Sequence, residues 1–310
     1  MEIIELSKQE YKTYVTQPFT RFEEVEFYEL NSHKVDVVKY FLFNNGKNRF
    51  AFVGGIKDSI LKFPFSASFE CLSEISKNNR ISHYYETVES LVNWAKNNNI
   101  ETIKITTPPN YYAQEHITKF VNALFINNFK IQDIDVNFEY YLKNFDDKYI
   151  ENLDIKARQN LKKSLKMNLS FEKTADFESV YDVIKQNRES KGYPLWMSLE
   201  DVKNTSKIIP TDLFLIKDEF GKPITSAICH RITNDILRVV YWGNIQNSDY
   251  FCPMNFIAYQ IFKWYKENSE IKIIDIGPST EDSKANFGLC DFKESIGCSC
   301  SEKKVFIKKL

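Results

Sequence analysis

The feature that most constrains the fold is a repeated order of strands and helices in the two halves of the chain. Apolar residues in the first half alternate as in strands or recur at helical spacing, in the order β-β-α-β-α-β. The predicted strands are 35–43, 49–53, 103–106 and 138–142, and the predicted helices cover 88–95 and 117–124. The second half follows a similar order with one more strand at its start: strands 212–217, 224–231, 236–242, 271–276 and 305–308, a helix over 254–265, and a short helix after Ser279.

The connectors of the two halves also correspond. Residues 103–109 follow the first long helix and residues 271–278 follow the second, and each segment is an apolar strand that ends in proline. Proline cannot donate to a strand ladder, so each strand is expected to stop there. We therefore predict two tandem α/β domains, residues 1–148 and 149–310, each with a mixed, largely antiparallel central sheet.

Composition excludes several classes of protein. The 310 residues are enough for two cores, and the net charge of −1 gives no overall attraction to nucleic acid or membrane. No apolar run approaches the roughly 20 residues of a membrane span, and no signal-peptide pattern begins the chain, so we expect a cytoplasmic protein. The six cysteines include no CxxC pair, and we expect no metal site.

Residues 273–297 carry most of the candidate chemistry. Asp275 lies within an apolar strand that ends at a Gly-Pro pair, and a buried carboxylate requires a partner. Ser279 and Asp282 have the spacing of a capping box, which predicts a helix start, and Gly288 is the expected left-handed terminator. A helix N-terminus beside a strand end is suited to binding an anionic or carbonyl oxygen of a ligand.

Several motifs give the chain a resemblance to the Fem-type peptidoglycan bridge aminoacyltransferases, which carry two GNAT acyltransferase units in tandem. They are Arg158–Lys163, Tyr241–Gly243, Pro253-Met254, Asp275–Ser279 and Phe292–Glu294. The resemblance covers nearly the whole chain. It implies transfer of an amino acid from aminoacyl-tRNA to an amine of a cell-wall precursor peptide.

Two departures from the family leave the acyl donor open. The paired-helix insertion of some members is absent, so a bound tRNA would contact the compact body of the protein. The residues between Trp242 and Met254 do not match the GNAT loop Gln/Arg-x-x-Gly-x-Gly/Ala, whose amides hold the pyrophosphate of coenzyme A. Aminoacyl-tRNA and acyl-CoA are both candidate donors, and the acceptor and the oligomeric state are open as well.

Lys293 and Asp275 are the candidate catalytic residues. Lys293 follows Phe292, and the resemblance implies that this lysine lies in the acyl-transfer channel, where its charge stabilises the oxyanion of the tetrahedral intermediate. A surface lysine after a core phenylalanine is the alternative. Asp275 either bonds backbone amides of the next turn or orients and deprotonates the acceptor amine.

The remaining candidates are expected to bind substrate: Arg158, Lys162, Tyr241, Trp242, Ser279 and Phe292. Arg158 and Lys162 belong to a basic helix over 156–166, which is either a solvated face or a site for a pyrophosphate or a tRNA backbone. Ala157, Leu161 and Leu165 are expected to bury its other side. The aromatic loop 193–196 either lines an acceptor cleft or packs in the core. Cys229-His230 is not expected to act as a dyad, because neighbouring strand residues point to opposite faces.

The sequence thus predicts an N-acyltransferase that moves an activated acyl or aminoacyl group directly to a small-molecule or peptide amine, without a covalent enzyme intermediate. Two alternatives stay open. The first is a coenzyme A dependent N-acetyltransferase. The second is a catalytically degenerate module that binds a wall precursor or a protein, because a shared fold does not transfer activity.

Overall fold

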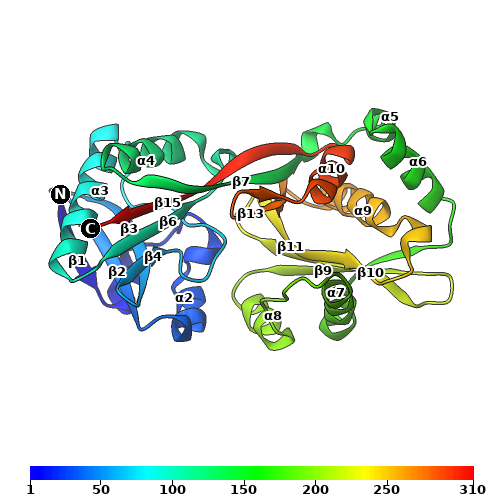
Figure 1. The fold of residues 1–310 in the computed structure, drawn as a ribbon, viewed down its shortest axis with the longest axis horizontal. Coiled ribbons are helices and arrows are strands. Elements are labelled where there is room, and N and C mark those ends of the chain that lie inside the picture. The colour runs from blue at the N-terminus through cyan, green and yellow to red at the C-terminus, as the bar shows by residue number, and fades with distance from the viewer. The chain divides into compact units, whose positions relative to one another are not determined.

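The computed structural model describes residues 1–310 and divides into two compact units. Unit 1 comprises Met1–Val136, Glu281–Lys284 and Ser301–Leu310, and unit 2 comprises Asn137–Thr280 and Ala285–Cys300. Each unit buries its own core: the core of unit 1 is rich in phenylalanine, and the core of unit 2 centres on β-strand residues and the long helix α9 (Pro253–Asn268). Figure 1 labels α9 among the elements of unit 2.

Unit 1 is built on a sheet with the strand order β1-β2-β3-β4-β6-β15, in which β15 (Ser299–Lys309) is the final strand of the chain. Its elements are β1 (Glu2–Leu6), α1 (Lys8–Tyr14), α2 (Val25–Asn31), β2 (Val37–Asn44), β3 (Asn48–Lys57), β4 (Ile60–Phe63), α3 (Ile81–Asn97), β6 (Thr102–Thr107) and α4 (Gln114–Ile126). All neighbours in this sheet pair antiparallel except β4 and β6, which are parallel.

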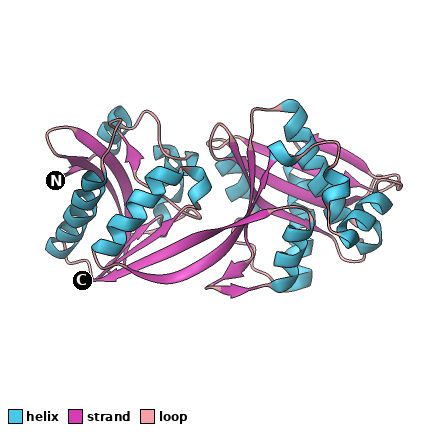
Figure 2. Ribbon diagram, turned by 90° about the horizontal axis from the view of Figure 1, so that it is seen from above, coloured by secondary structure: helices cyan, strands magenta, loops and turns pink.

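Unit 2 repeats this plan with the strand order β7-β12-β11-β10-β9-β8. Its elements are α5 (Tyr149–Asn152), α6 (Ile155–Ser164), β8 (Ser170–Thr174), α7 (Phe177–Lys191), α8 (Leu199–Ser206), β9 (Thr211–Lys217), β10 (Pro223–Arg231), β11 (Ile236–Asn244), α9, β12 (Ile273–Pro278) and α10 (Phe287–Ser295). Only β11 and β12 are parallel. The prediction of α/β units with mixed, largely antiparallel sheets is confirmed by this strand pairing, and Figure 2 shows the helices that cover the strands.

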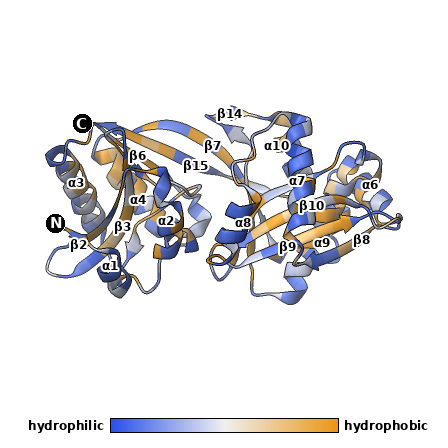
Figure 3. Cartoon of the chain, turned by 90° about the horizontal axis from the view of Figure 1, so that it is seen from below, coloured by the Kyte–Doolittle hydropathy of each residue, from blue (hydrophilic) through white to orange (hydrophobic).

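Local sequence explains where the helices of unit 2 begin and end. The side chains of Asp176 and Ser198 accept hydrogen bonds from backbone amides at the starts of α7 and α8. Gly192 ends α7 in a left-handed conformation. Figure 3 shows hydrophilic colour along α7 and α8 and apolar colour along β10, as expected for helices that cover a buried sheet. α7 packs against β10 and β11.

The last strand of each half contributes to the sheet of the other unit. β7 (Lys130–Tyr141) pairs with β12 through Asn137–Tyr141, and β15 (Ser299–Lys309) pairs with β6 through Lys304–Lys309. Tyr140 therefore packs in the core of unit 2, and Phe306 packs in the core of unit 1. The compact units thus differ from the predicted ranges 1–148 and 149–310 by residues 137–148, 281–284 and 301–310.

Two further sequence expectations differ from the structure. The first half contains a third meander strand, β4, so the two halves match more closely than predicted. The expected helix start at Ser279 is wrong: Thr280–Glu281 and Lys284–Ala285 form a short hairpin, because Asp282 and Ser283 adopt positive φ angles of 48° and 63°. α10 begins at Phe287, where Asn286 caps it, and Gly288 lies inside the helix rather than ending it.

Candidate functional site

The candidate site of unit 2 begins where β11 and β12 stop pairing. These parallel strands share a register only over Ile236–Arg238 and Ile273–Asp275. Beyond this point, which we call the fork, β11 continues beside β10 and β12 continues beside β7. Backbone polar groups on strand edges that have separated require other partners, so a fork of this kind is suited to an extended ligand.

A buried ion pair lies at the last paired position of the fork. Asp275 is 0% exposed and pairs with Arg238, its neighbour in the register. Oδ1 of Asp275 also accepts the backbone N–H of Gly277 at 2.8 Å and the side-chain amide of Asn137 at 3.0 Å. The structure therefore contains the bond to the next turn that was one of the two expectations for Asp275. Gly277 has a φ of +77°, a conformation that other residues rarely adopt.

Lys293 is the buried cation of the site, and it is not a surface lysine. Its ammonium donates to the carbonyl oxygens of Gly277 at 2.8 Å and Pro278 at 3.1 Å. Burial lowers the pKa of Lys293 to about 8, with smaller opposing effects from Cys298 and Asp275. An ammonium has three donors, so the two carbonyls leave one N–H for a further acceptor.

Several predicted binding residues surround Lys293. The Trp242 and Phe292 rings meet edge to face with centroids 5.9 Å apart, which joins the end of β11 to α10. Ser279 is buried beside Pro278, and no protein group bonds its hydroxyl. The structure thus gathers Trp242, Phe292, Lys293 and Ser279 at one end of unit 2, while Ser279 does not cap a helix.

The basic helix α6 contributes a charged surface to the same unit. Lys156, Lys162 and Lys163 of α6 are exposed, as is Lys166, which lies beyond the end of the helix at Ser164, and none of them, nor Arg158, forms an ion pair. The Arg158 guanidinium instead bonds the carbonyl oxygen of Glu151 at 3.1 Å. Lys163 lies 3.9 Å from the ring centroid of the exposed Tyr250, and the helix packs against α9 and α10. Ala157 and Leu161 are buried as expected, but Leu165 is 41% exposed.

The loop between β11 and α9 closes on itself. The Asn244 amide donates to Ser248 Oγ at 3.0 Å and to Asp249 Oδ1 at 2.9 Å. The amides of Ser248, Phe251 and Cys252 bond carbonyls of the loop, and the first helical residue is a proline, which has no N–H. A pyrophosphate cradle needs amides that point outward and no carboxylate among them. In this loop three amides are already bonded and Asp249 supplies a carboxylate.

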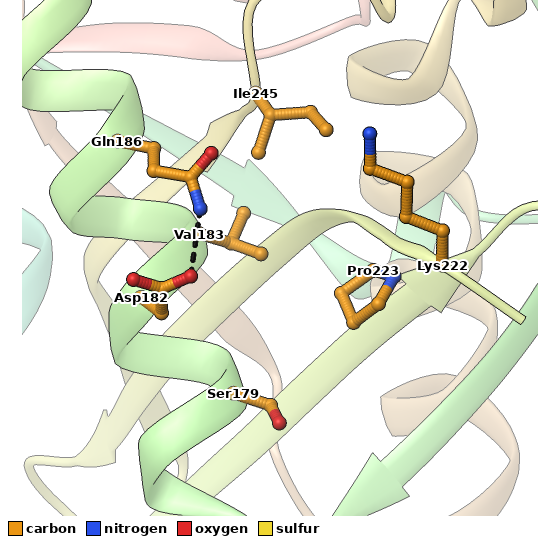
Figure 4. Close-up of a pocket in the computed structure, with 7 residues that line it drawn as sticks. All are labelled: Ser179, Asp182, Val183, Gln186, Lys222, Pro223 and Ile245. Carbon is orange, nitrogen blue, oxygen red and sulfur yellow. Dashed lines mark hydrogen bonds between the residues drawn. The ribbon is translucent and has the colours of Figure 1, made fainter.

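Other candidates lie outside this constellation. Cys229 and His230 are buried, and no protein group bonds either His230 ring nitrogen; burial lowers the pKa of His230 to about 4. A shallow pocket of about 180 Å³ is lined by α7 and β10 residues and by Ile245 (Figure 4). Its polar groups include Gln186, bonded to Asp182, and Lys222, and no predicted site residue lines it. No group of His, Cys, Asp or Glu side chains is arranged to hold a metal, and no helix is long and apolar enough to cross a membrane.

Sequence reasoning missed the partner of Asp275. Arg238 is the single charged residue in the apolar strand Ile236–Val240, just as Asp275 is the single charge in its own strand. Two lone opposite charges in apolar strands are a signal for a buried pair, since neither is stable there alone. Asn286, which caps α10, was also missed.

Comparison with known proteins supports the fold. No family model matches the sequence, and no curated protein matches it. The crystal structure of FemX matches with a TM-score of 0.70 and 14% identity, covering 100% of this chain and 98% of FemX. L-PGS from Bacillus licheniformis matches with a TM-score of 0.61 and 9% identity, covering 98% and 93% of the two chains.

A tandem GNAT protein of the clavulanic acid biosynthesis pathway matches with a TM-score of 0.57 and 7% identity, covering 99% of this chain and 98% of that one. At such low identities, a match over the full length of both chains is a statement about the fold. The two units described above, each with its meander and long helix, agree with that statement. The chain has the fold of FemX and of this tandem GNAT protein.

Proposed function

We propose that this protein is an N-acyltransferase that transfers an acyl or aminoacyl group to an amine, as in Fem-type enzymes. The observation that carries the proposal is the Lys293 ammonium, buried beside the fork with two of its donors bound to the Gly277 and Pro278 carbonyls. A fixed positive charge in a site that excludes water is what an acyl-transfer transition state requires. The FemX fold supports the same reaction class.

The residues suggest direct transfer. The acceptor amine attacks the carbonyl carbon of the activated acyl group, and negative charge develops on the carbonyl oxygen. Lys293 stabilises that oxyanion with its remaining N–H. The carbon–oxygen bond to the leaving group then breaks, and the proton lost by the amine passes to the leaving oxygen. Because burial lowers the pKa of Lys293 to about 8, the ammonium can relay this single proton: it gives one to the leaving oxygen and takes up the one that the amine loses.

Asp275 has a positioning role in this mechanism. Its carboxylate is bound by Arg238, Asn137 and the Gly277 amide, and burial separates it from solvent. A carboxylate held by three donors is a weak base. Its effect on the reaction would come through the Gly277 turn, whose carbonyl holds Lys293.

We propose aminoacyl-tRNA as the donor and a peptide amine, such as that of a cell-wall precursor, as the acceptor. The closed loop after β11 argues against coenzyme A in unit 2, because several of its amides are already bonded and Asp249 places a carboxylate among them. The unpaired cations of α6, Arg158 and Lys162 among them, and the exposed Tyr250 suit a nucleic-acid backbone. A cytoplasmic location is consistent with both substrates.

Transfer of a labelled amino acid from aminoacyl-tRNA to a UDP-linked muropeptide tests the proposal. Lys293→Met should lower turnover about 100-fold or more with a small change in acceptor KM, because the interaction forms in the transition state. Lys272→Met is the matched control, since the Lys272 side chain is 74% exposed. Unchanged turnover in Lys293→Met would remove this lysine from the mechanism. Thermal stabilisation by acyl-CoA would favour a coenzyme A dependent N-acetyltransferase. Stabilisation by neither donor nor acceptor would favour a catalytically degenerate binding module.

A further inference from the structure

Arg188, in the last turn of α7, is held between two tyrosine rings and has no acidic partner. Its guanidinium carbon lies 5.3 Å from the ring centroid of Tyr241 and 5.9 Å from that of Tyr193. It forms no ion pair, and its Nε is buried without a protein acceptor. Buried donors on charged groups are costly to leave unbonded, so this nitrogen is suited to an acceptor supplied by a ligand.

The surroundings of Arg188 are open and aromatic. Tyr193 is 40% exposed, Trp196 in the same loop is 80% exposed, and Phe287 at the start of α10 is 76% exposed. The side-chain amide of Asn286 donates to the Tyr193 hydroxyl at 2.9 Å and so joins that loop to α10. We call Tyr193, Trp196 and Phe287 the aromatic rim. Large aromatic side chains left open to solvent on two joined segments offer an apolar surface to a ligand.

Arg188 is connected to the candidate site through Tyr193, not through β11. Tyr241 contacts the guanidinium and Trp242 packs against Phe292, but consecutive strand residues point to opposite faces of the sheet. Tyr193, the other ring beside the guanidinium, accepts a hydrogen bond from Asn286, the residue that caps α10. The Tyr241 hydroxyl is bound by the backbone of Trp196 and Met197, which ties the rim loop to the strand. Arg188 is therefore linked through Tyr193 and Asn286 to α10, the helix that carries Lys293.

We propose that Arg188 binds an oxyanion, a carboxylate or a phosphate, of the acceptor substrate, whose apolar part lies on the aromatic rim. The inference rests on the proposed function for the identity of the ligand as an acceptor. A guanidinium presents a planar fork of donors that matches both oxyanions, and two flanking rings fix its plane. The alternative is that Arg188 helps to end α7. This explains its buried guanidinium less well, because the Arg188 side chain donates to none of the carbonyl oxygens in the last turn of the helix.

Direct binding to the purified full chain tests the proposal without any need for turnover. The peptide probe is N-acetyl-D-alanyl-D-alanine, compared with its C-terminal amide. The phosphate probe is N-acetylglucosamine 1-phosphate, compared with N-acetylglucosamine. Tryptophan fluorescence and calorimetry report binding, and Trp196 lies in the rim itself. We expect one anionic probe to bind at least tenfold more tightly than its neutral counterpart, and the better pair identifies the oxyanion.

Variants separate Arg188 from a general effect of charge. Arg188→Met should weaken the preferred anionic probe about 10- to 100-fold and leave the neutral probe unchanged, because one charge-assisted bidentate contact is lost. Arg188→Lys should bind the anionic probe with intermediate affinity, since lysine keeps the charge but lacks the planar set of donors. Lys185→Met removes an exposed charge from the same helix and should bind as the wild type does. Thermal unfolding checks that each variant is folded.

Equal affinity of wild type and folded Arg188→Met for the anionic probes would overturn the proposal, as would an absence of saturable binding to both anions. If Arg188→Met does not fold, Arg188→Lys is the deciding variant. Wild-type affinity of Arg188→Lys for both anions would contradict recognition by the planar guanidinium. A chain that binds the oxyanion through Arg188 yet transfers no acyl group would refute the proposed function alone. Loss of turnover in Lys293→Met together with wild-type oxyanion binding in Arg188→Met would refute this inference alone.

Discussion

Replacing Lys293 by methionine should flatten the pH dependence of stability above pH 8. Burial lowers the pKa of this lysine from about 10.5 to about 8 in the folded protein. Above pH 8 the unfolded chain therefore binds more protons than the folded one, and the free energy of unfolding rises with pH until about 10.5. Between pH 8 and pH 10 the average difference is about 0.8 proton, which corresponds to roughly 2 kcal/mol.

Urea unfolding of the wild type and of Lys293→Met at pH 8, 9 and 10 measures this difference. All other groups titrate in both proteins, so the difference between the two curves isolates Lys293. The wild type should gain about 2 kcal/mol relative to the variant over this range. Lys272→Met, which changes an exposed lysine, should run parallel to the wild type. Parallel curves for wild type and Lys293→Met would refute the burial argument, and with it the idea that Lys293 is held in a water-excluded site.

Three further predictions concern stability. A Cβ on Gly243 would lie 2.5 Å from the side chain of Asn187, so Gly243→Ala should cost about 1–3 kcal/mol in urea unfolding, and most of that cost should disappear in an Asn187→Ala background. Additive costs would show that the two side chains do not meet. Asp275→Asn should cost about 3–5 kcal/mol because it leaves Arg238 buried without its charge partner, and the double variant with Arg238→Met should recover part of this loss in thermal unfolding. Burial raises the pKa of Glu23 to about 8, so its contribution to stability is full below pH 4.5 and is lost as pH rises to 8. Glu23→Gln should therefore gain at least about 1 kcal/mol on the wild type between pH 5 and pH 8, and an unchanged difference would place that carboxyl in contact with water.

The fold was predictable from sequence where a regular pattern of apolar residues extends over many positions. The helix α9 and the strands β9 to β11 follow regular patterns, and the structure contains them within a few residues of the predicted limits. β4 was missed because only four residues form it, between a turn and Pro64. No local sequence pattern reveals the exchange of the final strands. The strands that contain Tyr140 and Phe306 would show the same alternation of apolar and polar residues whichever sheet they joined.

The site was predictable only in part. The Phe292-Lys293 pair was identified through the family resemblance. The burial of Lys293 could be seen only in the structure, because the sequence of a helix does not show which of its sides faces the end of a strand. The Ser279 cap failed because backbone geometry at Asp282 and Ser283 favours a turn over a helix. Arg188 had no sequence signal beyond its place near a helix end, where basic residues are ordinary.

The contacts within unit 2 define an order of dependence for the site. Arg238 and Asn137 hold Asp275, Asp275 holds the Gly277 amide, and the Gly277 carbonyl holds Lys293. Burying a lysine cation is unfavourable unless such acceptors are already in place. The carbonyls therefore have to be fixed by groups that do not themselves meet substrate. This order explains why a chain would keep a buried aspartate whose oxygens are all engaged: it sets the direction of a turn, and the turn sets the position of the cation.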